Sequence, residues 1–120
     1  TIAKVVVIPA CAQGLICLDS FKELLEEHKD YTLKIASITG CSNVTGIKTP
    51  YYEVAKLIHE YNGVCFVDFA CSAPYVKIDM HPEDAEAYLD AIFFSPHKFL
   101  GGPGTSGVLI FNKKLYKWSR

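Results

Sequence analysis

An acid and an amine stand directly after two apolar segments of this chain, and together they could do cofactor chemistry. Asp68 follows the apolar run 64–67, and Lys98 follows the apolar run 91–94 and precedes a glycine-rich turn. A lysine amine can hold an aldehyde as a Schiff base, and a carboxylate can keep a pyridine nitrogen protonated. Pyridoxal phosphate (PLP) requires both groups, so the pair predicts a PLP site.

Ser95 and His97 lie on the same short segment as Lys98. A hydroxyl can donate a hydrogen bond to a phosphate, and an imidazole can add a charge or a second hydrogen bond there. Plainer interpretations stay open, since most lysines are solvated surface charges and an aspartate at a strand end often binds loop amides. The prediction therefore depends on the group rather than on any one member.

Hydrophobic periodicity predicts the elements that must position these side chains. Apolar and β-branched runs indicate strands at 4–9, 33–39, 64–68, 91–95 and 107–111. A helix is expected from Ser20, where Glu23 completes a capping box. A second helix is expected between Pro50 and the stop at Asn62-Gly63, and a short one from Pro82. The strand at 64–68 lacks alternation, which indicates cover on both faces.

This order of elements predicts an α/β domain with three layers and a mostly parallel sheet. The first four strands are expected to be parallel, with right-handed crossovers. No helix separates the last two strands, so the last strand is expected to be antiparallel. Ligands of such sheets bind at the carboxyl ends of the strands. The polar clusters Ser42–Gly46, Asp68 and Ser95–Lys98 are therefore expected to converge on one edge.

The composition excludes several function classes. With 120 residues and a net charge of -1, the chain holds one domain at most and has no basic footprint for nucleic acid or an acidic membrane surface. No apolar stretch approaches the ~20 residues that span a membrane. The short length and the 50% hydrophobic content indicate a fragment whose apolar faces belong against absent partners.

The cysteines are spaced as reduced thiols rather than as a disulfide framework or a zinc site. Their number is odd and no C-x-x-C pair occurs among Cys11, Cys17, Cys41, Cys65 and Cys71. Reduced thiols are typical of the cytoplasm, which is the expected localisation. No metal site is expected, since His81 has no second ligand at metal spacing. His28 and His59 lie among charged helix residues and are expected to be solvated.

Two further motifs match known sites by letter alone. Gly102-x-Gly104-x-x-Gly107 has the dinucleotide fingerprint, but it precedes a predicted strand instead of opening a helix. Cys71, His97 and Asp68 could be imagined as a thiol-protease set, yet no local sequence supports one. The glycines are expected instead to let the backbone turn sharply beside Lys98.

Three segments, Ser42–Gly46, Val67-Asp68 and Ser95-x-His97-Lys98, resemble the large domain of class V aminotransferases from about Val5 to Leu115. That family includes the cysteine desulfurases and has the fold of the fold-type I PLP-dependent transferases. The resemblance implies that Lys98 forms the Schiff base and moves protons at the substrate's alpha carbon. It also implies cofactor-binding roles for the others: Asp68 on the pyridine nitrogen, Asn43 on the phenolic oxygen, and Ser95 and His97 on the phosphate.

Cys71 departs from the family pattern. Desulfurases usually carry a glutamine three residues after the aspartate, where it helps to hold the phenolic oxygen, and here Cys71 occupies that cofactor-binding position. A thiol is a poor substitute donor, which favours a less specialised class V member. The resemblance also implies that residues 1–120 are a partial PLP-binding large domain, without the N-terminal part and the small C-terminal domain.

The sequence therefore predicts a PLP-dependent enzyme that acts on a small amino-acid substrate by transamination, or as a lyase by desulfuration or another elimination. The parent is expected to be a homodimer that binds neither nucleic acid nor membrane. This chain alone is expected to be inactive. The competing interpretation is a non-catalytic α/β domain that keeps the fold for interaction or regulation.

Overall fold

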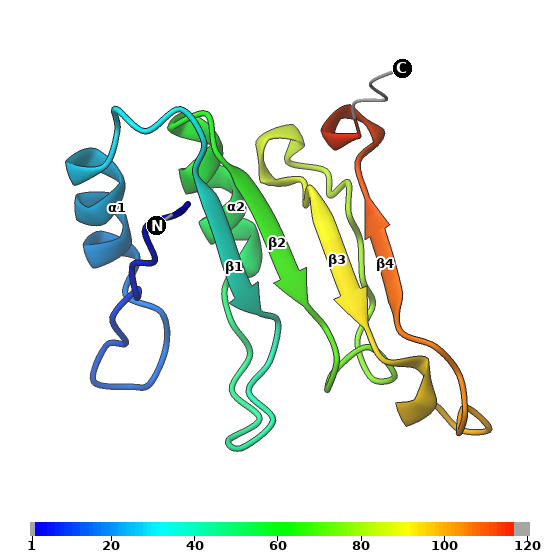
Figure 1. Cartoon of the computed structure of the whole chain (residues 1–120). Coiled ribbons are helices and arrows are strands. Elements are labelled where there is room, and N and C mark those ends of the chain that lie inside the picture. The colour runs from blue at the N-terminus through cyan, green and yellow to red at the C-terminus, as the bar shows by residue number, and fades with distance from the viewer. Residues whose placement is uncertain (1, 117–120) are drawn as a thin grey trace.

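The computed structural model describes residues 2–116, which form one mixed sheet with helices (Figure 1). The helices are α1 (Leu18–Glu27) and α2 (Tyr51–Glu60), and the strands are β1 (Ile35–Thr39), β2 (Val64–Asp68), β3 (Ala91–Phe94) and β4 (Val108–Phe111). Short 3-10 turns are η1 (Ala85–Ala87), η2 (Pro96–Lys98) and η3 (Lys113–Leu115). The strand order is β1-β2-β3-β4, with β1, β2 and β3 parallel and β4 antiparallel to β3. The predicted α/β fold with an antiparallel last strand is confirmed.

Helix α2 packs its apolar stripe on β1 and β2, and α1 packs on α2. Val54 and Ala55 are fully buried in this layer, at the centre of the core. The core cluster consists of Phe21, Leu25, Ala36, Ile38, Val54, Ala55, Ile58, Cys65, Val67, Phe69, Leu89 and Ile92. Burial of these side chains is the main contribution to the stability of the fold.

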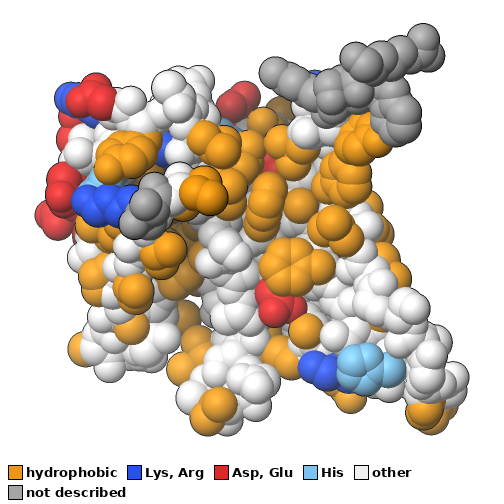
Figure 2. Space-filling view, in the orientation of Figure 1, with side chains coloured by type: hydrophobic (Ala, Val, Ile, Leu, Met, Phe, Trp, Pro, Cys, Tyr) orange, Lys and Arg blue, Asp and Glu red, His pale blue; other side chains and the backbone are white. Residues whose placement is uncertain are grey.

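Side chains alternate between the two faces of β1 and β2, contrary to the expectation that 64–68 is covered on both sides. Cys65 and Val67 are buried, whereas Phe66 and Asp68 are half-buried on the other face. Ser37 of β1 is exposed. Figure 2 shows hydrophobic side chains spread over the surface in this region. Residues 2–116 thus supply the sheet and one of the two helical layers expected around it.

The strand predicted at 4–9 is wrong. This segment joins no ladder, and its vicinity holds a single isolated bridge between Ala10 and Ile16 within the described residues. Val5 and Val7 are 88% and 81% exposed. A strand is held by backbone hydrogen bonds to a neighbouring strand, whereas the backbone of this segment bonds, among residues 2–116, through the carbonyl of Pro9, which accepts from the amide of Cys17 at 3.0 Å. The parallel part of the sheet therefore has three strands instead of four.

The helix ends differ from the predicted signals. Helix α1 begins at Leu18 after Cys17, so Ser20 lies in the first turn and forms no capping box with Glu23. Pro50 is the N-cap of α2 rather than its first residue. After α2 the left-handed conformation falls on Asn62, with φ of 56°. Gly63 is needed for close approach, because a Cβ there would lie 2.5 Å from Cγ1 of Ile58.

His59 is buried, which corrects the expectation that it is solvated. Its Nε2 lies 2.8 Å from Oδ2 of Asp90, and its Nδ1 lies 2.8 Å from the carbonyl oxygen of Glu86. Its ring stacks on Tyr88 with centroids 4.0 Å apart. His59 therefore ties α2 to the segment that leads into β3. The predicted helix from Pro82 is the single turn η1 in that segment.

Candidate functional site

The three parallel strands end at the same edge of the sheet. Thr39 pairs with Asp68, and Asp68 pairs with Phe93. The backbone pairing continues beyond the strands, since the amide of Gly40 donates to the carbonyl of Asp68 at 2.7 Å. The loops that follow β1, β2 and β3 carry the polar clusters singled out in the sequence, and Figure 1 shows these loops together below the arrowheads.

The charges of Lys98 and Asp68 both shift the pKa of the Cys71 thiol. Burial raises the pKa of Cys71, the neighbouring Cys41 thiol raises it further by charge repulsion and a hydrogen bond, and the Asp68 carboxylate adds to this. The Lys98 ammonium lowers the same pKa. The charges of Lys98 and Asp68 thus have opposite effects on the pKa of the same thiol.

The turn that presents Lys98 is set by its neighbours. Pro96 begins η2, the amide of Lys98 donates to the carbonyl of Ser95 at 3.0 Å, and the chain then reverses through the glycine-rich segment. A Cβ on Gly102 would lie 2.0 Å from the carbonyl oxygen of Pro96. Gly104 has φ of 86°, a conformation that L side chains rarely adopt. The glycines thus serve the sharp turn that the sequence indicated.

Ser95 is half-buried, whereas His97 and Lys98 are exposed on the surface of the turn. In the space-filling view a histidine and a lysine side chain lie next to each other at the edge of the molecule (Figure 2). An exposed amine and imidazole are free to meet a ligand that arrives from solvent. The structure brings these two residues, Asp68 and Cys71 to the same edge.

Asn43 lies on a hairpin-like loop closed by an isolated bridge between Cys41 and Lys48. The hydroxyl of Ser42 shapes its tip by accepting from the amides of Val44 at 3.2 Å and Thr45 at 3.1 Å. Asn43 itself is exposed. No hydrogen bond joins its side chain to the acid or the amine in the part of the chain that the structure describes.

The plainer interpretation of Asp68 holds for one of its oxygens. Its Oδ1 accepts from the amide of Ala70 at 2.7 Å, as a carboxylate that caps a loop does. This bond fixes the orientation of the side chain at the strand end. It leaves Oδ2 as the oxygen that can meet a ligand.

Sequence reasoning missed Ser72 and the contact between Cys41 and Cys71. Ser72 lines a cleft of about 280 Å³ under the loops after β1 and β2, and its Oγ finds no hydrogen-bond partner among residues 2–116. The Sγ of Cys71 donates to the carbonyl of Cys41 at 3.0 Å. The sequence carried no signal for either feature, because both depend on how two loops pack.

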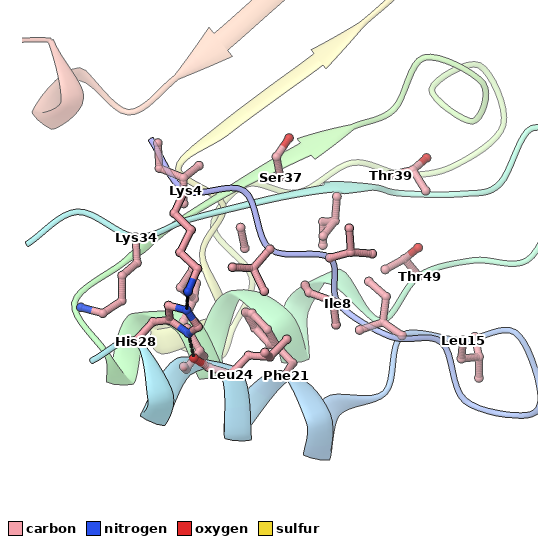
Figure 3. A pocket seen from close by; sticks show the side chains of 18 of the residues that line it. Lys4, Ile8, Leu15, Phe21, Leu24, His28, Lys34, Ser37, Thr39 and Thr49 are labelled. Carbon is pink, nitrogen blue, oxygen red and sulfur yellow. Dashed lines mark hydrogen bonds between the residues drawn. The ribbon is translucent and has the colours of Figure 1, made fainter. Parts of the chain in front are cut away.

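The larger cleft lies elsewhere, between the N-terminal segment, α1 and β1. It has a volume of about 550 Å³ and includes none of the predicted site residues. Figure 3 shows Lys4 reaching His28, with Nζ and Nε2 2.7 Å apart, while Nδ1 of His28 lies 2.8 Å from the carbonyl of Leu24. Phe21 and Ile8 also line this cleft. It marks the place where the segment 4–9 runs beside β1 without pairing to it.

Two further findings concern residues 2–116. Among them, no group of three or more His, Cys, Asp or Glu side chains could hold a metal ion. No helix in this part of the chain is long and apolar enough to cross a membrane.

The chain matches the family model "Aminotransferase class-V" over residues 1–119. It is 34% identical over 114 residues to a probable cysteine desulfurase of Halalkalibacterium halodurans, which covers 95% of this chain and 26% of that protein. It is 32% identical over 113 residues to a cysteine desulfurase of Synechococcus elongatus, covering 94% of this chain and 17% of that protein. The chain thus spans about a quarter of these relatives or less.

Solved structures agree with these relatives. The cysteine desulfurase CsdA of Escherichia coli superposes with a TM-score of 0.73 at 30% identity, over 90% of this chain and 25% of that one. A NifS-like protein of Rickettsia africae superposes with a TM-score of 0.72 at 26% identity, over 85% of this chain and 26% of that one. The family model covers nearly the whole sequence, and the chain belongs to the class V aminotransferase family.

Proposed function

We propose that this chain carries the cofactor-binding acid and amine of a PLP-dependent class V enzyme that acts on an amino acid. The observation that supports this most is that Asp68 ends β2 and pairs with Phe93 of the parallel neighbour β3, whose following turn carries Lys98. The residue types suit PLP, since they offer an amine for the aldehyde, an acid for the ring nitrogen and hydroxyl and imidazole groups for the phosphate. When bound, PLP supplies an electron sink for reactions at the alpha carbon of an amino acid.

The acid and the amine have distinct tasks in this proposal. Lys98 holds the aldehyde carbon through Nζ and, once released, moves a proton to and from the alpha carbon of the substrate. Asp68 keeps a proton on the ring nitrogen through Oδ2, because its Oδ1 already accepts from Ala70 at 2.7 Å. The loop amide therefore orients the carboxylate for its task.

The remaining residues position the cofactor. Ser95 and His97 bind the phosphate from the turn that presents Lys98, and Asn43 binds the phenolic oxygen from its hairpin-like loop. Cys71 stands beside that oxygen, in the place where relatives have glutamine. Its raised pKa keeps it a neutral thiol near neutral pH, so it can offer a weak S–H donor there.

The names of the relatives favour cysteine as the amino acid and desulfuration as the reaction. Cys71 favours transamination as the second candidate, since a thiol is a weaker donor than the amide that desulfurases carry. The products of the full-length protein decide between the two. Desulfuration of cysteine yields alanine and sulfur at the persulfide level, whereas transamination yields a keto acid.

In this proposal residues 1–120 are part of the large domain of a cytoplasmic homodimer. The chain alone then binds PLP weakly and has no turnover, because Lys98 and His97 are exposed and a small ligand needs a concave site that covers most of its surface.

The test uses the full-length protein loaded with PLP. Borohydride reduction fixes the cofactor to the lysine that holds it, and peptide mapping is expected to find the label on Lys98. The variant Lys98→Arg should abolish labelling, while the matched variant Lys77→Arg, next to the small cleft, should leave it unchanged. A label on another lysine refutes the assignment. A protein that shows no absorbance of bound PLP supports the non-catalytic interpretation.

A further inference from the structure

Two cysteines meet at the edge of the sheet that carries the proposed site. Cys41 follows the end of β1 closely, and Cys71 follows the end of β2. The two strands are parallel neighbours paired through Thr39 and Asp68, and the bond from Gly40 to Asp68 at 2.7 Å extends the pairing into the loops. The two loops therefore leave the sheet side by side, which brings cysteines 30 residues apart in the sequence into contact.

The thiol of Cys71 points toward the loop that carries Cys41, whereas the thiol of Cys41 points into its own loop. The Sγ of Cys71 lies 3.0 Å from the carbonyl oxygen of Cys41. The Sγ of Cys41 lies 3.3 Å from the carbonyl of Gly46, inside its own loop. Both cysteines are partly exposed, so a small oxidant can reach them. Thiols are weak donors, so these contacts are readily exchanged for a covalent bond between the two sulfur atoms.

We propose that Cys41 and Cys71 are a redox site, which forms a reversible disulfide across the carboxyl ends of β1 and β2 when the protein meets a hydroperoxide. This inference needs no cofactor, so it goes beyond the proposed function. It also assigns a purpose to the cysteine that replaces the family's glutamine.

The reaction proceeds in two steps. The Cys41 sulfur, as thiolate, attacks the peroxide oxygen, the O–O bond breaks, and the leaving oxygen takes a proton as water or alcohol, which leaves a sulfenic acid on Cys41. The Cys71 sulfur then attacks the Cys41 sulfur, the S–O bond breaks, and the hydroxide leaves as water with the Cys71 proton. Both thiols are oxidised and the peroxide is reduced. Two molecules of a small thiol then reduce the protein disulfide by successive exchange: the first forms a mixed disulfide, and the second releases it as the oxidised small-molecule disulfide.

The surroundings of Cys71 assign the order of these steps. Burial, the Cys41 thiol and the Asp68 carboxylate raise the pKa of Cys71, and Lys98 opposes them. Cys71 therefore carries its proton near neutral pH, and the first attack on the peroxide falls to Cys41. Cys71 acts as the resolving thiol.

The disulfide would also alter the proposed PLP site, a consequence that rests on the proposed function. It would join the loop that carries Asn43 to the loop that follows Asp68, and it would remove the S–H of Cys71, whose pKa both Asp68 and Lys98 affect. Oxidation would then change cofactor binding without touching Lys98.

The experiment maps disulfides in the full-length protein without PLP. The protein is treated with hydrogen peroxide, remaining thiols are alkylated, and the chain is cut after lysine and before aspartate. Cleavage before Asp68 separates Cys71 from Cys65, so the expected product joins peptides 35–48 and 68–77 and has a mass about 2 Da below their sum. Dithiothreitol should separate the two peptides again. Recovery of both peptides alkylated, after peroxide has oxidised other thiols, overturns the proposal.

Three variants sharpen the result. Cys41→Ser and Cys71→Ser should each abolish the linked product. Cys17→Ser is the matched control, because hydrogen bonds from Ser20 lower the pKa of Cys17 and make it a reactive thiol at the start of α1. Loss of the link in Cys17→Ser contradicts the proposal, and so does a link between Cys11 and Cys17 instead of the expected product in the unsubstituted protein. The borohydride label on Lys98 in the reduced protein is a separate readout, so failure of the PLP assignment is distinguishable.

Discussion

Replacing Asp90 with alanine is expected to destabilise the fold by about 3–5 kcal/mol, because it removes a buried side chain that hydrogen-bonds two buried partners. The side chains of His59 and Asp90 are 7% and 6% exposed, and Nε2 lies 2.8 Å from Oδ2. The same Oδ2 accepts from the amide of Cys65 at 2.8 Å. The substitution therefore leaves a buried amide and a buried imidazole without their acceptor, at about 1–3 kcal/mol each, which agrees with the first figure.

Urea unfolding of the purified chain, followed by circular dichroism, measures this loss. At a slope of about 2 kcal/mol/M, the midpoint should fall by about 2 M in Asp90→Ala. The matched control is Lys56→Ala, which removes the ion pair with Asp84, where Nζ and Oδ2 are 2.9 Å apart and both side chains are 50% exposed. Its midpoint should barely move, because exposed pairs contribute little. Equal shifts in the two variants would refute the conclusion that burial makes the His59 contact important.

Three other predictions concern the turn, the thiols and the isolated chain. Gly102→Ala should distort the Lys98 turn and weaken PLP binding to the full-length protein, because the added Cβ would lie 2.0 Å from the carbonyl oxygen of Pro96. Gly107→Ala is the control in the same PLP titration, since its Cβ would lie 3.9 Å from the nearest backbone oxygen. Burial raises the pKa of Cys65 to about 12, so the Cys65 thiol stays protonated and should escape alkylation at about pH 8. Cys17, whose pKa is lowered, should be alkylated first. Mass spectrometry that finds Cys65 alkylated before Cys17 contradicts both assignments. Absorbance titration of the 120-residue chain with PLP should show weak binding and no turnover, and saturation at micromolar PLP would contradict this.

The sequence was sufficient to predict the elements that form the sheet and the edge where polar residues gather. Apolar runs that end in a polar residue, such as the run before Asp68, mark strands whose carboxyl ends are solvent-accessible. The missing helix before β4 indicated its antiparallel direction, and the pairing of Ala91 with Phe111 confirms it. These inferences succeed because each depends on local pattern and chain length, which a sequence shows directly.

The errors share a physical cause, which is that the outcome depended on a partner distant in the sequence. The run 4–9 has the composition of a strand, but it forms a strand only where the backbone of a neighbouring strand pairs with it. His59 lies among charged helix residues, yet Asp90 and Glu86 meet it from 31 and 27 residues away. Propensity describes what a segment prefers, whereas tertiary contacts decide what it does.

The register between β1 and β2 connects the core of this chain to its proposed site. Since side chains alternate along a strand, a slip of one residue would turn Cys65 and Val67 away from α2 and send the Asp68 carboxylate into the core. The loss of apolar burial and the cost of an ionised carboxylate in the core both oppose that slip. The observed register also places Asp68 at the edge that Lys98 reaches and sets Cys71 against Cys41. Apolar residues that never meet a ligand thus determine where the acid, the amine and the two thiols stand.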